Sequence, residues 1–350
     1  MLLVIVHILL SLCLLAAVLT VYLPASIVPI PAWFSLAFEW LLAAEIITGV
    51  LLLFTRRRRW TWLTAGMLVL SVAPALHTVS HRALIFPKRE LQHSFTLMSY
   101  NTRLMDDVRK PKQNRVIQYI LRTQPDVVCL QEVEVSKSGS HLTLRELRDA
   151  LSIYPYTYFD FKIYNSHRQY GNAVFSRYPL TNKHTLRYES RGNITSVCDL
   201  VLPTDTICLY INHLESNRIE RKDLDLGTTT EQAQSAVAGT SAKLTKASEI
   251  RVQQARAIHN DVSASPHPVL IVGDMNTTPV SYTYRILQRG MRDAFLESSN
   301  GQLGHTFVKH GLGVRIDYIL HSKELSAFGF DVPHVDYSDH YPIITTIRYE

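Results

Sequence analysis

Residues 269–276 read Val-Leu-Ile-Val-Gly-Asp-Met-Asn, an apolar run that ends in a glycine, a carboxylate and an amide. Consecutive Val, Leu and Ile residues followed by turn residues are typical of a buried strand. Polar side chains at the end of such a strand lie at a sheet edge, where binding sites of α/β proteins gather. For this stretch alone, a turn role is the simpler explanation of Asp274 and Asn276.

The same arrangement recurs along the chain after residue 93. Asn101, Glu132 and His213 each end an apolar run, Asp317 lies inside another, and the pair Asp339–His340 precedes the last one. Together with Asp274 and Asn276 at the end of the first run, these residues make six such sites. Turn roles at all six do not explain the recurrence. The pattern favours a catalytic site assembled from the ends of several strands.

The residue types at these sites suit phosphoester chemistry. Carboxylate and amide oxygens are hard ligands that favour Mg²⁺ or Mn²⁺, so we expect one of these ions as the cofactor. Such an ion neutralises charge on a phosphate oxygen, a carboxylate aligns or deprotonates water, and an imidazolium stabilises the transition state or protonates the leaving oxygen.

The four cysteines (Cys13, Cys129, Cys198 and Cys208) match no zinc spacing and no disulfide framework. Cys198 and Cys208 lie on two strand-like runs, which leaves a bridge open in an oxidising compartment. Two buried free thiols are the favoured interpretation.

Charge is distributed unevenly over the 350 residues, whose formal net charge is +6. Residues 1–89 hold seven basic and two acidic residues, so the remainder is close to neutral. The globular part therefore lacks the bulk positive charge that dominates non-specific DNA affinity.

The N-terminal region is strongly apolar and contains no Asp, Glu, Lys or Arg before Glu39. Three stretches have the ~20 residues that cross a ~30 Å hydrocarbon core: Leu2–Leu23, Ala32–Phe54 and Trp60–Val79. A cleaved signal peptide explains the first stretch badly, because a basic n-region is missing. Within the second stretch, Glu39 can lie near the interface. Glu45 is costly in lipid, so it is expected to face another helix or to be protonated, and the sequence supports no functional role for it.

Arg56–Arg59 lie between the second and third stretches. Because cytoplasmic loops retain Lys and Arg, the third stretch is expected to run outward. We therefore expect a multi-pass protein of the cell (inner) membrane with an extracytoplasmic catalytic domain, and no obligate protein partner is evident.

Residues 93–350 alternate strand and helix patterns, which predicts an α+β domain with packed sheets. The expected strands are Phe95–Tyr100, Val127–Gln131, Ala173–Ser176, Ile194–Val201, Ile207–Asn212, Val269–Val272, Ile316–Leu320 and Ile343–Ile347. The expected helices are Asn114–Arg122, Leu142–Leu151, Ser248–Val262 and Tyr282–Gln288. The predicted order is an anchor (1–80), a linker (81–92) and a catalytic domain (93–350), in which the polar stretch 216–247 reads as a flexible insertion.

The polar sites and the residues around them together resemble the endonuclease/exonuclease/phosphatase superfamily, which includes deoxyribonucleases, neutral sphingomyelinases and inositol-polyphosphate 5-phosphatases. The motifs that carry the resemblance are Asn101-Thr102-Arg103, Leu130-Gln131-Glu132-Val133, Gly171–Arg177, Asn212-His213-Leu214, Gly273–Asn276, Arg315–Ile319 and Ser338-Asp339-His340. The resemblance spans about residues 93–350 and implies a four-layer sandwich of two β-sheets flanked by helices.

The resemblance also implies roles for individual residues. Glu132 would be the principal metal ligand, with Asn101 close by and Asp339 assisting. Asp274 would activate water and Asn276 would orient the phosphate or the nucleophile. His213 and His340 would contact the scissile phosphate, and Asp317 would orient His340. Asn172, Tyr170 and Arg103 would contact the substrate, although a packing role for Tyr170 is equally open.

Histidine at position 213 sets the chain apart from the abasic-site repair branch, which typically has asparagine there. Arg103 replaces an acidic residue common in repair enzymes, which leaves a second metal ion in doubt. The favoured substrate is a lipid or small extracytoplasmic phosphoester. A membrane-tethered nuclease acting on DNA or RNA is the alternative, and a non-catalytic binding scaffold is the least favoured.

Overall fold

A computed structural model describes residues 1–27, 33–80, 93–107, 111–137, 141–163, 167–188, 190, 193–219, 223, 225, 229–299, 301–309 and 312–349. The predicted linker 81–92 lies outside these residues. The chain divides into two compact units. One combines Met1–Val79 with Ser216–Ala255 and Thr277–Ile286, and the other comprises Ser80–Glu215, Arg256–Asn276 and Leu287–Glu350.

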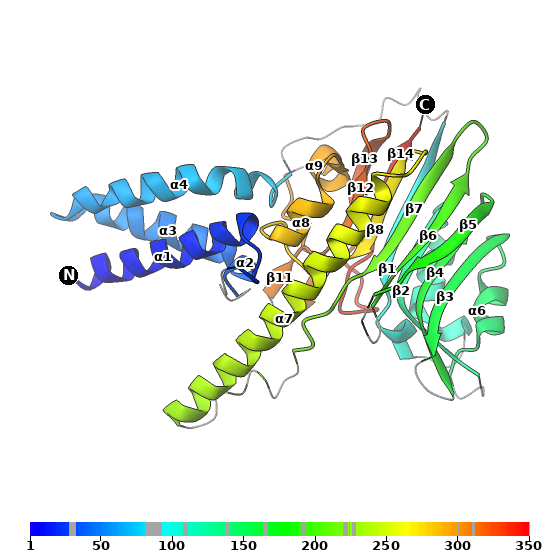
Figure 1. Ribbon diagram of the computed structural model, residues 1–350, viewed down its shortest axis with the longest axis horizontal. Helices are drawn as coiled ribbons and strands as arrows, with labels where there is room; N and C mark the ends of the chain where they lie inside the picture. Colours follow the sequence, from blue (N-terminus) through cyan, green and yellow to red (C-terminus); the bar gives the residue numbers. More distant parts are fainter. Residues whose placement is uncertain are drawn as a thin grey trace. The chain divides into compact units, whose positions relative to one another are not determined.

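The second of these units is built on two six-stranded sheets (Figure 1). The first sheet has the spatial order β13 (Ser326–Asp331), β14 (Ile343–Arg348), β1 (Ser94–Asn101), β2 (Val127–Ser136), β4 (Arg168–Ser176) and β3 (Tyr156–Ile163). The second has the order β5 (Leu180–Leu186), β6 (Ile194–Val201), β7 (Thr206–His213), β8 (Val269–Asp274), β12 (Asp317–His321) and β9 (Arg292–Asp293). A small hairpin joins β10 (Phe307–Lys309) to β11 (Leu312–Val314).

Each sheet contains one parallel pair, and these two pairs position the site. β1 is parallel to β2, and β7 is parallel to β8. Parallel strands end at the same edge of a sheet. Asn101 therefore lies beside Gln131 in one sheet, and His213 lies beside Asp274 in the other.

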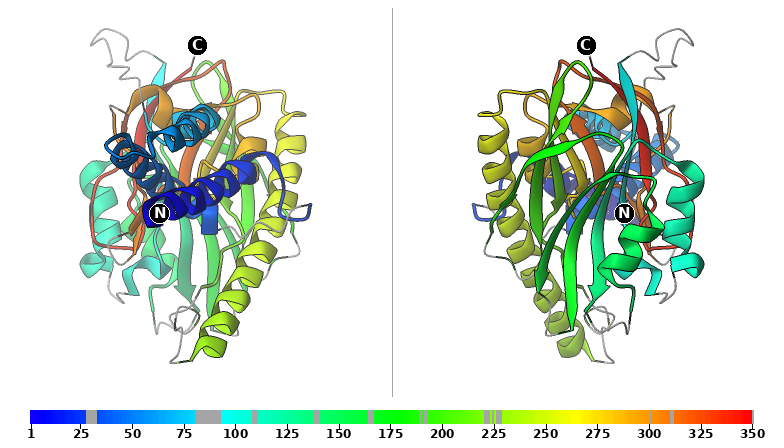
Figure 2. Two further views of the ribbon diagram at one scale, coloured as in Figure 1. Left: turned by 90° about the vertical axis from the view of Figure 1, so that its left-hand side faces the viewer. Right: turned by 90° about the vertical axis from the view of Figure 1, so that its right-hand side faces the viewer.

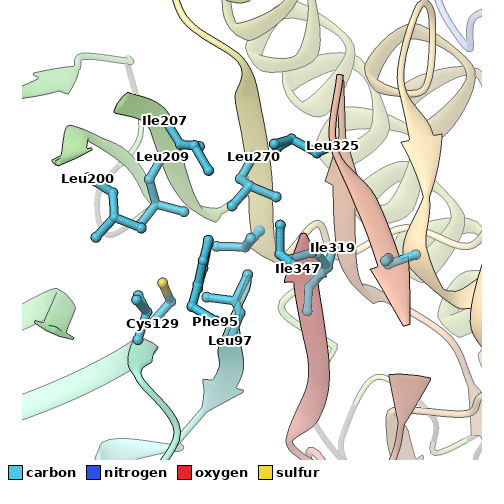
Figure 3. Close-up of a cluster of buried hydrophobic side chains, with 14 of the residues drawn as sticks. Phe95, Leu97, Cys129, Leu200, Ile207, Leu209, Leu270, Ile319, Leu325 and Ile347 are labelled. Carbon is cyan, nitrogen blue, oxygen red and sulfur yellow. The ribbon is translucent and has the colours of Figure 1, made fainter. Parts of the chain in front are cut away.

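The main hydrophobic core lies between the two sheets. Phe95, Leu97 and Cys129 enter it from the first sheet, and residues such as Leu209, Leu270 and Ile319 enter it from the second (Figure 3). The helices α5 (Arg115–Thr123) and α6 (Leu144–Ala150) belong to a second core cluster, on the outer face of the first sheet (Figure 2). Two packed mixed sheets with flanking helices confirm the predicted α+β sandwich.

Shorter helices complete this unit and its neighbour. They are η2 (Leu104–Asp107), η3 (Pro111–Gln113), α9 (Ala294–Ser298), η1 (Arg58–Trp60) and α8 (Tyr282–Leu287).

The cysteines are free, and Cys129, Cys198 and Cys208 are buried. Cys198 pairs with Leu209 across the ladder, whereas Cys208 pairs with Asp199. Side chains alternate faces along a strand, so the Cys198 and Cys208 thiols point to opposite faces of the sheet. The favoured interpretation of buried free thiols is confirmed, and this register excludes the bridge.

The N-terminal unit contains the helices α1 (Leu2–Tyr22), α2 (Trp33–Leu36), α3 (Phe38–Leu53) and α4 (Thr61–Leu76). Among the described helices, only α1 is both long enough and apolar enough to be a membrane-span candidate. α3 and α4 have 16 residues each, which is short for a ~30 Å hydrocarbon core. The expectation of three spans is therefore not confirmed, although three apolar helices do pack together.

The stretch predicted as a flexible insertion is largely helical. α7 runs over Thr230–Val262, so the helix expected from Ser248 begins 18 residues earlier than predicted. Gln232 N donates to Thr229 Oγ1 at 3.2 Å, and Thr229 N donates to Gln232 Oε1 at 3.1 Å, the reciprocal bonds of a capping box. Ala, Gln, Glu and Lys then favour helix strongly enough to outweigh Gly239.

Candidate active site

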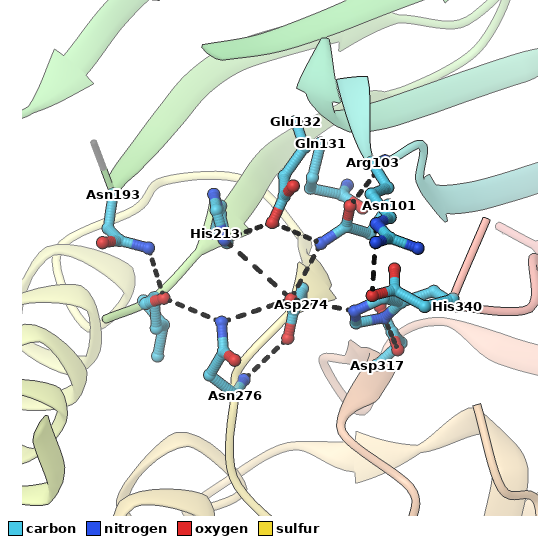
Figure 4. Close-up of polar contacts among 12 residues, drawn as sticks. Asn101, Arg103, Gln131, Glu132, Asn193, His213, Asp274, Asn276, Asp317 and His340 are labelled. Carbon is cyan, nitrogen blue, oxygen red and sulfur yellow. Dashed lines mark hydrogen bonds and ion pairs between the residues drawn. The ribbon is translucent and has the colours of Figure 1, made fainter. Parts of the chain in front are cut away.

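Carboxylates and imidazoles from three strand ends, a bulge within β2 and one loop meet at one edge of the two sheets (Figure 4). Asp274 ends β8, between His213 at the end of β7 and Asp317 at the start of β12 in the same sheet. Glu132 lies on β2 of the other sheet, and His340 precedes β14. The apolar runs thus fix the backbone, and the polar residues at their ends form the site.

Three unusual backbone conformations aim these side chains. Gly273 has φ +118°, and a Cβ there would overlap Asn212 O on the neighbouring strand. This close approach requires glycine immediately before Asp274. Glu132 lies in a bulge between Leu130 and Val133 with φ 53°, and Asn276 has φ 50°. Such bulges and left-handed residues re-aim side chains near active sites.

Asp274 is buried, and both of its carboxylate oxygens accept hydrogen bonds. Its Oδ1 accepts from Asn276 N at 2.8 Å, and its Oδ2 accepts from Asn101 Nδ2 at 2.9 Å and from Asn276 Nδ2 at 3.2 Å. Burial is the largest influence on this carboxyl and raises its pKa to about 6, with Asp317 adding to the rise and the two histidines opposing it. A base with this pKa is ionised at neutral pH and accepts a proton readily.

His340 and Asp317 form a buried pair. His340 Nδ1 lies 2.9 Å from Asp317 Oδ2, which leaves Nε2 facing Asp274 Oδ2 at 3.7 Å. Burial lowers the pKa of His340, but the charges of Asp317 and Asp274 outweigh it and raise the pKa to about 10. Thr306 Oγ1 accepts from Asp317 N at 3.1 Å and holds the strand start in place. The site therefore contains an imidazolium of fixed orientation.

Glu132 and His213 form the other half of the site. His213 Nε2 lies 3.3 Å from Glu132 Oε1, and Asn101 Nδ2 donates to the same oxygen at 3.2 Å. Tyr170 OH lies 3.4 Å from His213 Nδ1, and burial, followed by the charges of Glu132 and Asp274, raises the pKa of Tyr170. Tyr170 thus borders the site and packs against the His213 ring, and its predicted substrate contact stays a prediction.

The residues present fit a divalent cation. Glu132, His213 and Asp274 each offer a ligand atom, and these atoms lie within 4.8 Å of one another. His213 Nε2 is buried and makes no well-oriented hydrogen bond in the described chain, its 3.3 Å approach to Glu132 Oε1 being a charge contact alone, which is unusual for an imidazole nitrogen. The sequence predicted Glu132 as a ligand, and the geometry adds His213 and Asp274 as neighbours able to share it.

Three predicted residues lie at the margin of this cluster. Arg103 Nε is 3.6 Å from Asp339 Oδ2, and the Arg103 side chain is 64% exposed, so this pair is at the mouth of the site. Asn172 is buried, and its Nδ2 donates to Ile211 O at 2.9 Å and Ser196 Oγ at 3.1 Å. Its amide thus links the two sheets.

Three residues that frame the site escaped the sequence analysis as functional candidates. Thr306 supports Asp317, as described, and Ser338 Oγ donates to Asn101 O at 2.9 Å. The Phe307 ring packs edge-on against His340, with centroids 4.9 Å apart. Ser338 directly precedes the Asp339–His340 pair and so had a positional signal, whereas Thr306 and Phe307 follow no apolar run.

Comparisons with known proteins agree with this arrangement. The Endonuclease/Exonuclease/phosphatase family matches residues 98–340, whereas no curated protein sequence matches the chain. An endonuclease/exonuclease/phosphatase from Beutenbergia cavernae has a similar structure, with TM-score 0.54, 18% identity and coverage of 74% of this chain and 72% of that one. D. rerio TDP2 complexed with a single-strand DNA product also has a similar structure (TM-score 0.52, 15% identity, coverage of 73% of this chain and 99% of that one). The human Nocturnin catalytic domain with bound sulfate is also similar (0.51, 17%, 74% and 96%).

The family match extends over more than half of the chain, and its ends fall on β1 and on His340. The structural likenesses, at these low identities, support the fold alone. The chain belongs to the Endonuclease/Exonuclease/phosphatase family, whose members hydrolyse phosphoester bonds, usually with divalent metal ions.

Proposed function

We propose that this protein is a membrane-anchored, divalent-metal-dependent hydrolase of a lipid or small phosphoester. The observation that carries the catalytic part is the convergence of a buried base, Asp274, with an imidazolium, His340, 3.7 Å away. Two titratable groups whose environments separate their pKa values, to about 6 and about 10, are suited to act as base and acid in one reaction.

Each residue then has a role set by its contacts. Asp274 takes a proton from the attacking water, and Asn276, bonded to both Asp274 oxygens, orients that carboxylate. His340 stabilises the charge that develops on the phosphoryl group and protonates the leaving oxygen through Nε2, because Nδ1 is held by Asp317. A divalent ion, when bound by Glu132 and its neighbours, neutralises charge on a phosphate oxygen.

The membrane part of the proposal is supported by α1. This helix has a mean hydropathy of 3.0, and only 33% of its most apolar window is buried. Large side chains remain exposed on it and on α3 and α4, including Leu9, Leu12, Ile47, Leu53 and Val69. Exposed apolar surface of this extent needs a cover, and a lipid bilayer supplies one.

The extracytoplasmic placement rests on charge alone. Arg56–Arg59 follow α3, and a basic cluster beside an apolar helix favours the cytoplasmic side for that end. An alkaline phosphatase fused after Tyr349 is active only if exported. We expect an active fusion, and a well-expressed but inactive one reverses the orientation.

A nuclease is the second candidate. D. rerio TDP2, similar in fold, has been solved with a single-strand DNA product. Arg103 is exposed at the mouth of the site, where it could contact a further phosphate.

The deciding experiment is a substrate screen of the full chain in detergent, with Mg²⁺ or Mn²⁺. Sphingomyelin and other phospholipids, inositol phosphates, DNA and RNA are the substrates, and Asp274→Asn is the matched inactive control. Hydrolysis of a lipid or small phosphoester that Asp274→Asn abolishes supports the proposal. Salt-sensitive cleavage of DNA or RNA with no lipid turnover supports the nuclease. No activity on any substrate contradicts both.

A further inference from the structure

A polar cluster is buried among the apolar helices of the N-terminal unit, where α1, α3 and α4 pack together (Figure 1). His7 of α1 and Glu45 of α3 both have no exposed side-chain area. Ser11, Thr48 and Thr64 surround them and are also buried. Ionisable residues in such apolar surroundings are costly, which makes the pair a candidate site.

The hydrogen bonds of His7 fit a neutral imidazole. Nδ1 lies 2.9 Å from Thr48 Oγ1, whose own hydroxyl donates to Ala44 O at 2.9 Å. Thr48 therefore accepts from His7, and the proton is on Nδ1. Nε2 lies 3.2 Å from Thr64 Oγ1, which can donate to it. Both ring nitrogens are thus paired without an imidazolium.

The Glu45 carboxyl group has fewer hydrogen-bond partners than the His7 ring. Oε1 lies 2.9 Å from Ser11 Oγ, whose single hydroxyl proton also faces His7 O at 2.9 Å, and His7 Nε2 is 3.6 Å away, beyond hydrogen-bond length. Oε2 is buried and has no partner within the described chain. A buried carboxylate with one hydrogen bond is strongly disfavoured, whereas a carboxylic acid with its proton on Oε2 is neutral.

The other titratable groups on these helices lie elsewhere. α1 also carries Cys13 and Tyr22, α3 also carries Glu39 in its first turn, and α4 carries none. Glu39 and Glu45 are six residues apart, more than one and a half helical turns. Within the described helices, no second charge compensates an ionised Glu45 at hydrogen-bond distance.

We propose that the His7–Glu45 cluster is a proton-binding site in which Glu45 Oε2 holds one proton beside a neutral His7. The proton comes from water and returns to it, and its loss leaves one uncompensated negative charge between the three helices. Packing of α1 on α3 and α4 then depends on this proton. The inference is independent of the hydrolytic function.

Close packing of the helices is part of the site. Gly49 lies one turn after Glu45, and a Cβ there would overlap the Thr64 side chain. Glycine at this position lets α4 approach α3 and brings Thr64 to His7. Thr64 completes the pairing of the neutral ring, and so favours the proton on Glu45 over His7.

Infrared spectroscopy of the full chain in detergent tests this directly, through the C=O stretch of a protonated carboxylic acid. Spectra are recorded at pH 8, where Asp274, with its pKa of about 6, is ionised. We expect a carboxylic-acid band that disappears in Glu45→Gln and remains in Glu39→Gln, the matched control on the same helix. Ser11→Ala removes the hydrogen bond to Oε1 and should move the band to higher frequency.

A pH series of thermal unfolding provides the second measurement. Wild type and Glu39→Gln should lose stability as the pH rises and the proton leaves, whereas Glu45→Gln, a neutral mimic of the acid, should show a smaller loss. A spectrum without the band shows that Glu45 is ionised and overturns the proposal. A band that survives in Glu45→Gln and does not move in Ser11→Ala belongs to another acid and overturns it too. Should Glu45→Gln fail to fold, the Ser11→Ala shift alone decides.

Discussion

Asp274 is held among groups that act on its charge in opposite directions. Burial and the neighbouring Asp317 disfavour the carboxylate, while His340 and His213 favour it, and the resulting pKa is about 6. Ionised at neutral pH but poorly solvated, this carboxylate is destabilising to the fold and useful as a base. Functional groups of this kind often lower stability where they raise activity.

Asp274→Asn should therefore lower kcat by ~10²–10⁴, the range of a positioned general base, without lowering the melting temperature. The asparagine carbonyl can still accept from Asn276 N, so the local backbone keeps its bond. Steady-state kinetics and thermal unfolding at pH 8 measure the two effects. Wild-type turnover in this variant would remove Asp274 from the reaction.

The pairing of His340 with Asp317 predicts an alkaline limit to activity. Because the pKa of His340 is raised from 6.5 to about 10, the imidazolium persists below that pH and is lost as the pH rises through it. Its contribution to folding stability is lost over the same rise. The acid limb should follow Asp274, with activity lost as the pH falls through about 6.

Asp317→Asn should move the alkaline limb of kcat/KM toward lower pH, since the largest favourable charge on His340 is removed. Phe307→Leu is the matched control, because it keeps that charge and changes only the ring packed on His340. An alkaline limb that stays near 10 in Asp317→Asn would show that another group sets it.

Glu132 is the residue on which metal dependence should rest. Chelation should abolish activity, and added Mg²⁺ or Mn²⁺ should restore it. Glu132→Gln should raise the metal concentration needed for half-maximal activity by at least ~10–100-fold, the cost that is typical of losing even an outer-shell partner of a ligand. Glu134→Gln, two residues along the same strand, controls for strand packing. Full activity after exhaustive chelation would contradict the metal role.

At the scale of elements, continuous apolar runs were read correctly from sequence. β1, β6, β8 and β14 match their predicted runs because each is a buried strand of β-branched and large apolar residues. β5 was missed because its sequence Leu-Thr-Asn-Lys-His-Thr-Leu is mostly exposed and polar. β13 was missed because Gly329, with φ +58°, interrupts it.

Some residues of the candidate site could likewise be predicted from the sequence, and others could not. Asp274 and Glu132 could be predicted because each follows an apolar run, although Glu132 lies at a bulge within β2 and not at its end. The contacts of Asn172 and the packing of Phe307 on His340 depend on which strands become neighbours. Strand order is a property of the whole fold and is not encoded in any single run.

The helix α7 gives a prediction at this scale. Gly239 lies inside it with open space around its Cα, so Gly239→Ala should stabilise the protein by about 0.5–1 kcal/mol. Gly239→Pro should destabilise it by ~3 kcal/mol or more and lower the helical circular dichroism. If the segment were the flexible insertion that its composition suggests, both variants would unfold like wild type.

At the scale of the whole molecule, the compact units do not follow the order of the chain. The segment Thr277–Ile286 begins directly after Asn276, yet it belongs to the same unit as the N-terminal helices. Thr20 Oγ1 donates to Val280 O at 3.1 Å, and Thr278 Oγ1 donates to Ser35 O at 3.3 Å. The N-terminal helices thus have a packing role in addition to the proposed anchoring.

Val280 is the residue that tests this role. It is 1% exposed in a cluster with residues of α1, α3 and α4, including Leu14, Val18 and Phe38. Val280→Ala deletes two buried methyl groups and should cost about 2 kcal/mol of stability. Leu9→Ala is the control, because Leu9 is 57% exposed on α1 and its truncation should leave unfolding in detergent nearly unchanged.

Deleting residues 1–79 should have a larger effect of the same kind. It uncovers Val280, removes the Tyr22 ring from beneath the Arg285 guanidinium, 4.9 Å from its centroid, and removes His77 from Tyr284. Residues 277–286 directly follow Asn276. If they lose their fixed conformation, the position of Asp274 should therefore become less well defined. We expect a shortened protein with a lower melting temperature and a lower kcat on a soluble phosphodiester that needs no membrane. A shortened protein equal to the full chain in both measurements would show that residues 277–286 hold their conformation unaided, and that the helices serve as an anchor alone.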